Sequence, residues 1–250
     1  VMGRRWLPAE VEMIPTKMIE YSAKGKRTLK YAPGGAVGKV STVVGHVELG
    51  EILIGDVVVS DVSTAVMDPL PSIFGRPVGG ILGLDVLRRC ERLTMSLGGE
   101  SPSMRFGKKS LDAASDALEV PFSIVGSHLV IEVAVNGTPV HCILDTGAPD
   151  VFLDQPAAEA TNLDVDNSQR AEARGLGDGV IEHAPAQIKS LKLAGRQFSD
   201  GPCRVAPLTP FQSMRGESQY AGLLGNDFFG RFSRIEIDFT TYKVRFVPAL

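Results

Sequence analysis

The chain has 250 residues, of which 44% are hydrophobic and 22% are charged, as is typical of a globular protein with a full core. Its 26 basic and 29 acidic residues nearly balance, which argues against the basic surface that a nucleic-acid partner requires. The three cysteines and four histidines are scattered without the spacing of metal ligands, so we expect neither a metal nor a cofactor. No apolar run approaches the roughly 18 residues that would cross a bilayer, so we expect no membrane span.

The first part of the chain is predicted to consist mostly of short strands. Residues 7–15 are the exception, because Pro8 suits the first turn of a helix. Residues 108–118 combine charged and small side chains and are predicted to form a linker, with one helical turn at most.

The second part of the chain is predicted to open with a β-hairpin. Residues 128–145 contain two apolar or alternating runs joined by Asn136 and Gly137, which both tolerate the positive φ of a tight hairpin turn. Residues 155–163 are helix-like, with Pro156 in the first turn. Short strands with turn signals about every eight to twelve residues predict an all-β barrel or sandwich.

Two segments of the chain resemble two later segments. Residues 79–97 match residues 221–239 without a gap, sharing a glycine, two aliphatic residues, a second glycine and an aspartate in step. Residues 49–61 also match residues 188–200 at a similar offset, with slippage in the turns. Internal similarity of this kind indicates two copies of one unit. We therefore predict a first lobe in residues 1–107, the linker at residues 108–118, and a second lobe in residues 119–250.

One motif carries chemistry. Asp145, Thr146 and Gly147 follow an apolar strand, are followed by Ala148 and a second apolar strand, and precede the run Leu223-Leu224-Gly225. This order resembles the aspartic peptidases of the retropepsin and pepsin kind, and the resemblance covers residues 120–247. It implies two acid-protease β-barrel lobes, of which the first lacks its N-terminal strands.

The resemblance also implies roles for the three residues of the motif. Asp145 would be a catalytic carboxylate that activates water for hydrolysis of a peptide bond. Thr146 would tie its loop to an opposite loop through its hydroxyl, and Gly147 would let backbone N–H groups approach the carboxylate. In this family two carboxylates share one proton, so no metal is required.

A flexible hairpin that covers an extended peptide is a further expectation of the family. Residues 173–184 are glycine-rich in a strand-like setting, as such a flap would be. Gly175, Leu176, Gly177 and Gly179 are therefore predicted to bind a peptide or protein substrate. The alternative is a glycine-rich hairpin that does not touch substrate.

The first copy departs from the family because it lacks an Asp-Thr-Gly. Three alternatives follow: upstream residues, cleaved or trimmed away, supply the second aspartate; the protein forms a homodimer through Asp145; or it is a catalytically inactive relative that only binds peptides. We favour the upstream source, which allows a cleaved N-terminal fragment as partner. Asp85 and Asp227 occupy equivalent places in the two copies and are predicted to be structural. The double repeat is similar to exported bacterial peptidases, which makes an exported or periplasmic location the expectation.

Overall fold

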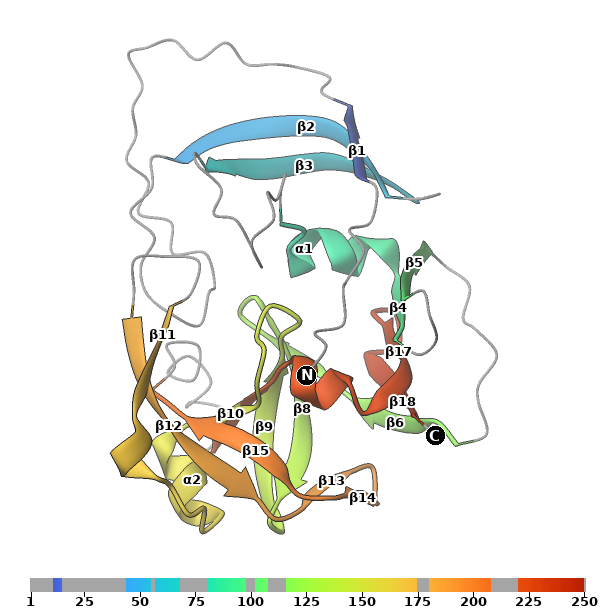
Figure 1. The fold of residues 1–250 in the computed structure, drawn as a ribbon. Coiled ribbons are helices and arrows are strands. Elements are labelled where there is room, and N and C mark those ends of the chain that lie inside the picture. The colour runs from blue at the N-terminus through green and yellow to red at the C-terminus, as the bar shows by residue number, and fades with distance from the viewer. Residues whose placement is uncertain are drawn as a thin grey trace.

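The computed structural model describes eight ranges of the chain: residues 11–14, 44–54, 57–67, 81–97, 102–107, 116–174, 180–207 and 220–249 (Figure 1). In these ranges the strands are many and the helices are short, so the predicted all-β class is confirmed. The strands form three sheets. The division of the chain into two lobes around residues 108–118 stays a prediction.

The largest sheet is built from residues that follow the predicted linker. Among the described residues it has ten strands, in the order β11-β12-β15-β10-β16-β9-β8-β13-β14, with β7 paired to β8. Their bounds are β7 Ser123–Val125, β8 His128–Val135, β9 Thr138–Leu144, β10 Phe152–Leu153, β11 Ala171–Arg174, β12 Val180–Ile188, β13 Leu191–Leu193, β14 Arg196–Phe198, β15 Gly201–Val205 and β16 Ala221–Leu224. β9 pairs in parallel with β16, and β10 with β15, so distant segments of the chain meet in the middle of the sheet.

The hairpin predicted at Asn136 and Gly137 is confirmed. These residues join β8 to β9 with φ values of 48° and 88°, the backbone of a tight hairpin turn. The side chain of Asn136 does more than the turn requires. Its amide nitrogen donates to the carbonyl of Thr161 at 2.9 Å, and its amide oxygen accepts from the backbone nitrogens of Lys189 and Ser190 at 3.0 Å. The side chain of Asn136 thus links its own turn to the end of the short helix after β10 and to the turn between β12 and β13.

A short helix follows β10, as predicted. Helix α2 spans Gln155–Ala160, with proline in its first turn. Asp154 caps it, because the carboxylate accepts a hydrogen bond from the backbone nitrogen of Ala157 at 2.9 Å. A single turn of 3-10 helix, η2, spans Asn167–Gln169.

A five-stranded antiparallel sheet joins segments from both predicted copies. Its order is β5-β4-β17-β18-β6. The bounds are β4 Arg92–Ser96, β5 Ser103–Gly107, β6 Leu118–Pro121, β17 Phe232–Asp238 and β18 Lys243–Pro248. At its centre Thr94 lies opposite Glu236, which is the residue that the repeat aligns with it. The pairs on either side are symmetric about this one: a residue before Thr94 lies opposite the residue that is equally far after Glu236. Because the repeat also aligns Thr94 with Glu236, β4 and β17 are related by a local two-fold axis through this pair.

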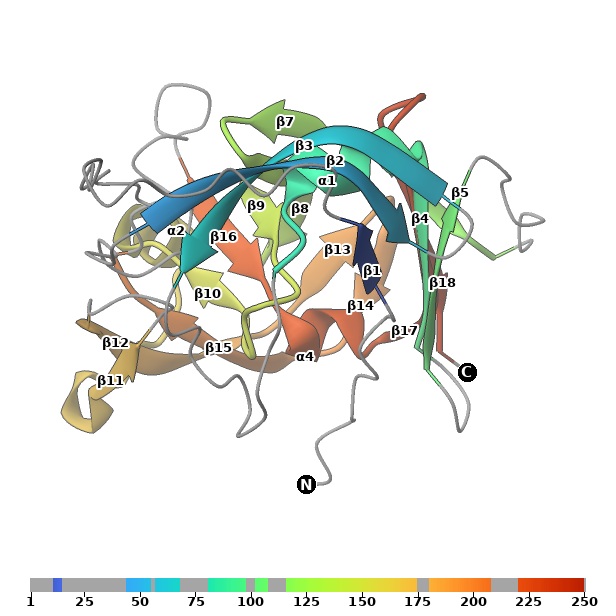
Figure 2. The same ribbon diagram turned by 90° about the horizontal axis from the view of Figure 1, so that it is seen from above.

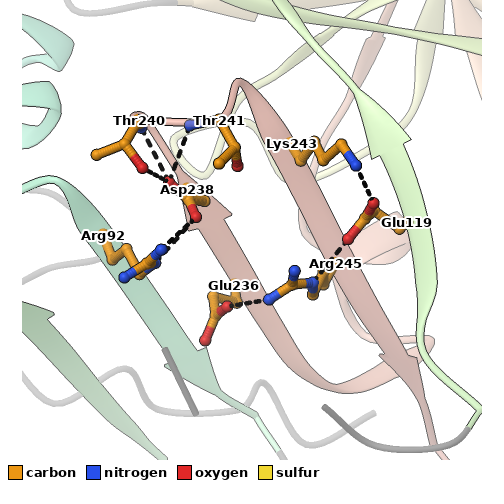
Figure 3. A network of polar contacts seen from close by, with 8 residues as sticks. All are labelled: Arg92, Glu119, Glu236, Asp238, Thr240, Thr241, Lys243 and Arg245. Atoms are coloured by element: carbon orange, nitrogen blue, oxygen red, sulfur yellow. Dashed lines mark hydrogen bonds and ion pairs between the residues drawn. The ribbon is translucent and has the colours of Figure 1, made fainter. Parts of the chain in front are cut away.

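The two faces of this sheet differ in polarity because side chains alternate along each strand. Ile235 and Ile237 enter the core, whereas Glu236 and Asp238 point to the other face. Figure 3 shows the charged side chains of that face forming a ladder across four strands. The ion pairs are Arg92–Asp238 at 2.7 Å, Arg245–Glu236 at 3.0 Å, Arg245–Glu119 at 2.8 Å and Lys243–Glu119.

The third sheet belongs to the first predicted copy. It contains β1 Val11–Ile14, β2 Val44–Ile54 and β3 Val57–Met67, in that order. Val11–Ile14 pairs antiparallel with β2, so the helix predicted for residues 7–15 is wrong over these four residues. Pro8 lies outside the described residues. The β-branched and apolar residues of this short run gain more from pairing with β2 than from a helix too short to be stable alone.

A short helix lies below this third sheet. Helix α1 Leu84–Leu87 and the 3-10 turn η1 Arg88–Cys90 follow each other directly, and Figure 2 shows β2 and β3 arching over them. Val86 and Cys90 pack there with side chains of β2 and β3 in a small apolar cluster. Helix α4 Asn226–Phe229 stands at the equivalent point of the second copy.

The main core lies between the ten-stranded and the five-stranded sheets. Its largest buried side chains are phenylalanines. The rings of Phe228 and Phe232 meet edge-on with centroids 5.1 Å apart, and those of Phe232 and Phe246 are tilted with centroids 4.8 Å apart. Leu93 and Met95 of β4 are part of the same core. Aromatic side chains bury the most apolar area per residue, so this cluster anchors α4 to β17 and β18, the strands that follow it.

Candidate active site

Asp145 lies at the end of β9, in the centre of the largest sheet. Its backbone nitrogen donates to the carbonyl of Leu224 at 3.1 Å, which extends the parallel pairing of β9 with β16. Its carboxylate accepts a hydrogen bond from the backbone nitrogen of Gly147 at 2.8 Å. The Asp145 side chain is half-buried, whereas Thr146 and Gly147 are exposed. The structure therefore places the three predicted motif residues together on one loop, with the carboxylate fixed and accessible.

The loop is supported from behind by β16 and the start of α4. The backbone nitrogen of Asn226 donates to the carbonyl of Ala148 at 2.9 Å, and that of Asp227 donates to Pro149 at 3.0 Å. Gly225 lies so close to the loop that a Cβ atom there would be 2.6 Å from the carbonyl oxygen of Ala148 and nearer still to that of Asp150. Only glycine leaves room for this approach.

A charged group that no sequence motif indicates lies beside the loop. The Nε atom of Arg204 on β15 donates to the carboxylate of Asp150, and its Nη1 atom lies 3.3 Å from Nδ1 of His183 on β12. His183 is buried and meets the ring of Phe152 edge-on at 6.1 Å. Burial and the charge of Arg204 lower the pKa of His183, against the opposing effect of Asp150, and this shift favours the neutral imidazole.

This group could only be found from the pairing of strands. Asp150 and Arg204 are far apart in the sequence, and they meet because Phe152 and Arg204 are partners in the parallel pair of β10 and β15. Asp227 lies near the same charged group and interacts electrostatically with Asp150 and Arg204. Partial burial and the nearby charge of Asp150 raise the pKa of its carboxyl, while Arg231 and Arg204 act in the opposite direction.

The predicted flap residues Gly175, Leu176, Gly177 and Gly179 lie outside the described residues. The strands on either side of them, β11 and β12, pair antiparallel from Ala171 opposite His183 to Arg174 opposite Val180. The chain therefore leaves and re-enters this segment at adjacent points, as it would in a hairpin. The assignment of these four residues to substrate binding stays a prediction.

Metal sites and membrane-spanning helices are two other features to consider in the described ranges. Nowhere in these ranges do three or more histidine, cysteine, aspartate or glutamate side chains come together to hold a metal ion. None of the helices that the structure describes is long and apolar enough to cross a membrane.

Part of the chain matches a known protein family in sequence. Residues 131–231 match the family model described as gag-polyprotein putative aspartyl protease. The chain is similar to a retropepsin-like aspartic protease from Rickettsia conorii, with 20% identity and a TM-score of 0.37 over 52% of this chain and 87% of that one. It is also similar to EIAV protease complexed with the inhibitor HBY-793, with 21% identity and a TM-score of 0.30 over 43% of this chain and 89% of that one. No curated protein matches the chain in sequence.

The family match and the geometry concern the same part of the chain. Residues 131–231 contain the Asp145 loop, the strand β16 that pairs with it, and the start of α4 that supports it from behind. This part of the chain is therefore similar in sequence to the gag-polyprotein putative aspartyl proteases.

Proposed function

We propose that this protein is an aspartic endopeptidase that hydrolyses a peptide or protein substrate with a water molecule activated by Asp145. The observation that carries the proposal is the carboxylate itself: it is half-buried, accepts the backbone N–H of Gly147, and lies on a loop within the family-matched segment. A carboxylate fixed in this way is accessible to water and to substrate, and its position needs no further ordering during the reaction.

Catalysis by this route uses a second carboxylate. Two carboxylates about 3 Å apart cannot both ionise, so they share a proton and titrate as a pair. The ionised partner draws a proton from water, which attacks the scissile carbonyl carbon. The protonated partner donates to the carbonyl oxygen, and a proton then passes to the leaving amine. Asp145 fills one of the two places, and the exposed Thr146 is positioned to meet the loop that brings the other.

The second carboxylate comes from upstream residues or from another chain. The sequence contains Asp-Thr-Gly once, at residues 145–147. A cleaved amino-terminal fragment that stays bound would appear as a second polypeptide in denaturing mass spectrometry. A homodimer through the Asp145 loop would lose specific activity on dilution, because dissociation separates the two carboxylates.

The flap completes the proposed substrate site. Gly175, Leu176, Gly177 and Gly179 would cover an extended peptide, since β11 and β12 bring the two ends of this segment together. Glycines allow the backbone of such a segment to approach a bound peptide closely.

The proposal is tested by Asp145→Asn, assayed on peptide substrates at acidic pH. The substitution keeps the size of the side chain but removes the group that takes the proton from water, so we expect at least about a hundredfold loss of kcat/KM. Asp164→Asn is the matched control, because Asp164 is exposed on a loop after α2, and it should retain full activity. Equal activity of the wild type and Asp145→Asn would reject the proposal.

A catalytically inactive peptide-binding protein is the second candidate, and the single Asp-Thr-Gly is the observation that favours it. A labelled peptide that binds the purified wild type without being cleaved, at any acidic pH and protein concentration, would establish this alternative. Cleavage that Asp145→Asn abolishes would exclude it.

A further inference from the structure

We propose that His128 is a positioning residue for Asp145: the imidazole of His128 lies near the same end of the β8–β9 pair as the carboxylate, and its protonation governs the ionisation of that carboxylate. The inference rests on the proposed function, since it assigns a role toward the catalytic group. It concerns a residue that neither the motif nor the family match marks out.

The pairing of β8 with β9 brings the two residues to the same end of these strands. The printed pairs run from Val135 opposite Thr138 to Val130 opposite Ile143. Continuing this register by two positions brings His128, the first residue of β8, opposite Asp145. Directly opposed residues of an antiparallel pair point to the same face, with Cβ atoms about 4.5 to 5.5 Å apart.

The face that carries His128 and Asp145 is apolar beside them. Val130 and Ile143, the next pair along the same face, are both almost fully buried, and they pack with Leu223 of β16. β7 folds back over the start of β8 and pairs Val125 with His128. His128 is therefore half-buried between an apolar pair and the active loop, where a charge interaction is stronger than in water.

Electrostatics agrees with this placement. Burial lowers the pKa of His128, and the negative charge of Asp145 acts in the opposite direction. Coupling of this kind is reciprocal: if ionised Asp145 favours the imidazolium, the imidazolium favours ionised Asp145 by the same free energy.

The other charged groups on the elements packed against β8 are engaged elsewhere. β7 carries no titratable side chain. Glu119 of β6 is paired with Lys243 and Arg245, and Lys192 of β13 meets the far end of β8, opposite Ala134. Within the described ranges, Asp145 is thus the charged group that His128 faces.

A second histidine–carboxylate pair on the same face provides an internal control. Glu132 of β8 lies opposite His141 of β9, with 4.0 Å between the carboxylate oxygen and Nε2. This pair is four residues further along the strands, or about 13 Å away, which exceeds the screening length of about 8 Å in physiological salt. His141 should therefore not respond to the charge of Asp145.

The first experiment needs no peptidase activity. The histidine ring protons of the wild type and of Asp145→Asn are titrated by NMR, with His128→Gln and His141→Gln used to assign the two signals. We expect Asp145→Asn to lower the midpoint of His128 by about 0.5 pH units or more and to leave that of His141 unchanged. An unchanged His128 midpoint would overturn the inference, whether or not the protein is a peptidase.

The second experiment measures kcat/KM against pH. The acid limb of this profile is the range in which kcat/KM falls as the pH is lowered. Removing the cation with His128→Gln should shift the acid limb to higher pH, because Asp145 then ionises less readily. His128→Arg should restore the acid limb, since arginine stays charged, and His141→Gln should match the wild type. A histidine that only packed against its neighbours would change the rate without moving the limb, and that result would also refute the proposal.

The two experiments separate the inference from the function on which it rests. A coupled His128 titration in a wild type that cleaves no peptide would reject the peptidase and keep the pairing of His128 with Asp145. Peptidase activity with an uncoupled His128 would support the peptidase and reject the pairing of His128 with Asp145. Thermal unfolding of each variant shows whether the fold is kept.

Discussion

At the scale of single residues, the Asp145 loop depends on how closely two backbone segments approach. Gly225 at the start of α4 lies against the carbonyl groups of Ala148 and Asp150. The sequence alone indicated both sides of this contact, because Asp-Thr-Gly and Leu-Leu-Gly are local motifs. It did not indicate Arg204 or His183, whose contact with the loop depends on long-range strand pairing.

Gly225→Ala should therefore impair the active loop. The added methyl group meets backbone atoms, which cannot rotate away as a side chain would, so we expect a loss of stability of about 1 to 3 kcal/mol and a marked fall in kcat/KM. Gly230→Ala is the control, because a Cβ there would lie 3.4 Å from the nearest backbone oxygen, an ordinary contact. Denaturant unfolding and peptide assays measure both effects. Wild-type behaviour of Gly225→Ala would show that the loop is looser than described.

At the scale of elements, predictions succeeded where a turn residue decides the structure. Asn136-Gly137 fixed the β8–β9 hairpin, and Pro156 marked the first turn of α2. The prediction for residues 7–15 failed at Val11–Ile14, because a short apolar run fits a helix or a strand equally well until its partner, here β2, is known. The order of strands in the sheets could not be read from the sequence for the same reason.

Asn136 tests how much one turn residue contributes beyond its turn. Asn136→Gly keeps the positive φ but removes hydrogen bonds to Thr161, Lys189 and Ser190, so we expect a loss of about 1 to 3 kcal/mol in the free energy of unfolding. Asn162→Gly is the matched control: Asn162 also has a positive φ, of 52°, and is exposed. Both variants loosen the unfolded chain equally, so the difference between their urea midpoints isolates the hydrogen bonds of Asn136. Equal midpoints would mean that these bonds contribute nothing.

At the scale of the whole molecule, the five-stranded sheet unites segments of both predicted copies. Its charged ladder joins β4 to β17 through Arg92 and Asp238. Burial raises the pKa of Asp238, but hydrogen bonds from Thr240 and Arg92 outweigh burial and hold it well below the usual range. The pKa of Glu119 is lowered by hydrogen bonds from Lys243 and Arg245.

These depressed pKa values predict a loss of stability in acid. A carboxylate that is more acidic in the folded state contributes stability that is fully present above its unfolded pKa, about 4, and is lost as the pH falls toward the folded value. Asp238→Asn should therefore lower the free energy of unfolding at neutral pH and flatten its fall below about pH 4. Urea unfolding at a series of pH values measures this, with Asp164→Asn as the exposed control. Parallel curves for Asp238→Asn and the wild type would contradict the assignment.

The local two-fold axis between β4 and β17 bears on why both units lie on one polypeptide. In a symmetric assembly of two identical chains, any residue on such an axis faces its own copy. Glu236 is almost fully buried at that place, and a second glutamate opposite it would set two carboxylates against each other with little water to screen them. A single polypeptide is free of that constraint, and here the opposing position is Thr94. Joining two related units in one chain thus permits an acidic residue on an axis where a pair of identical subunits would have to avoid it.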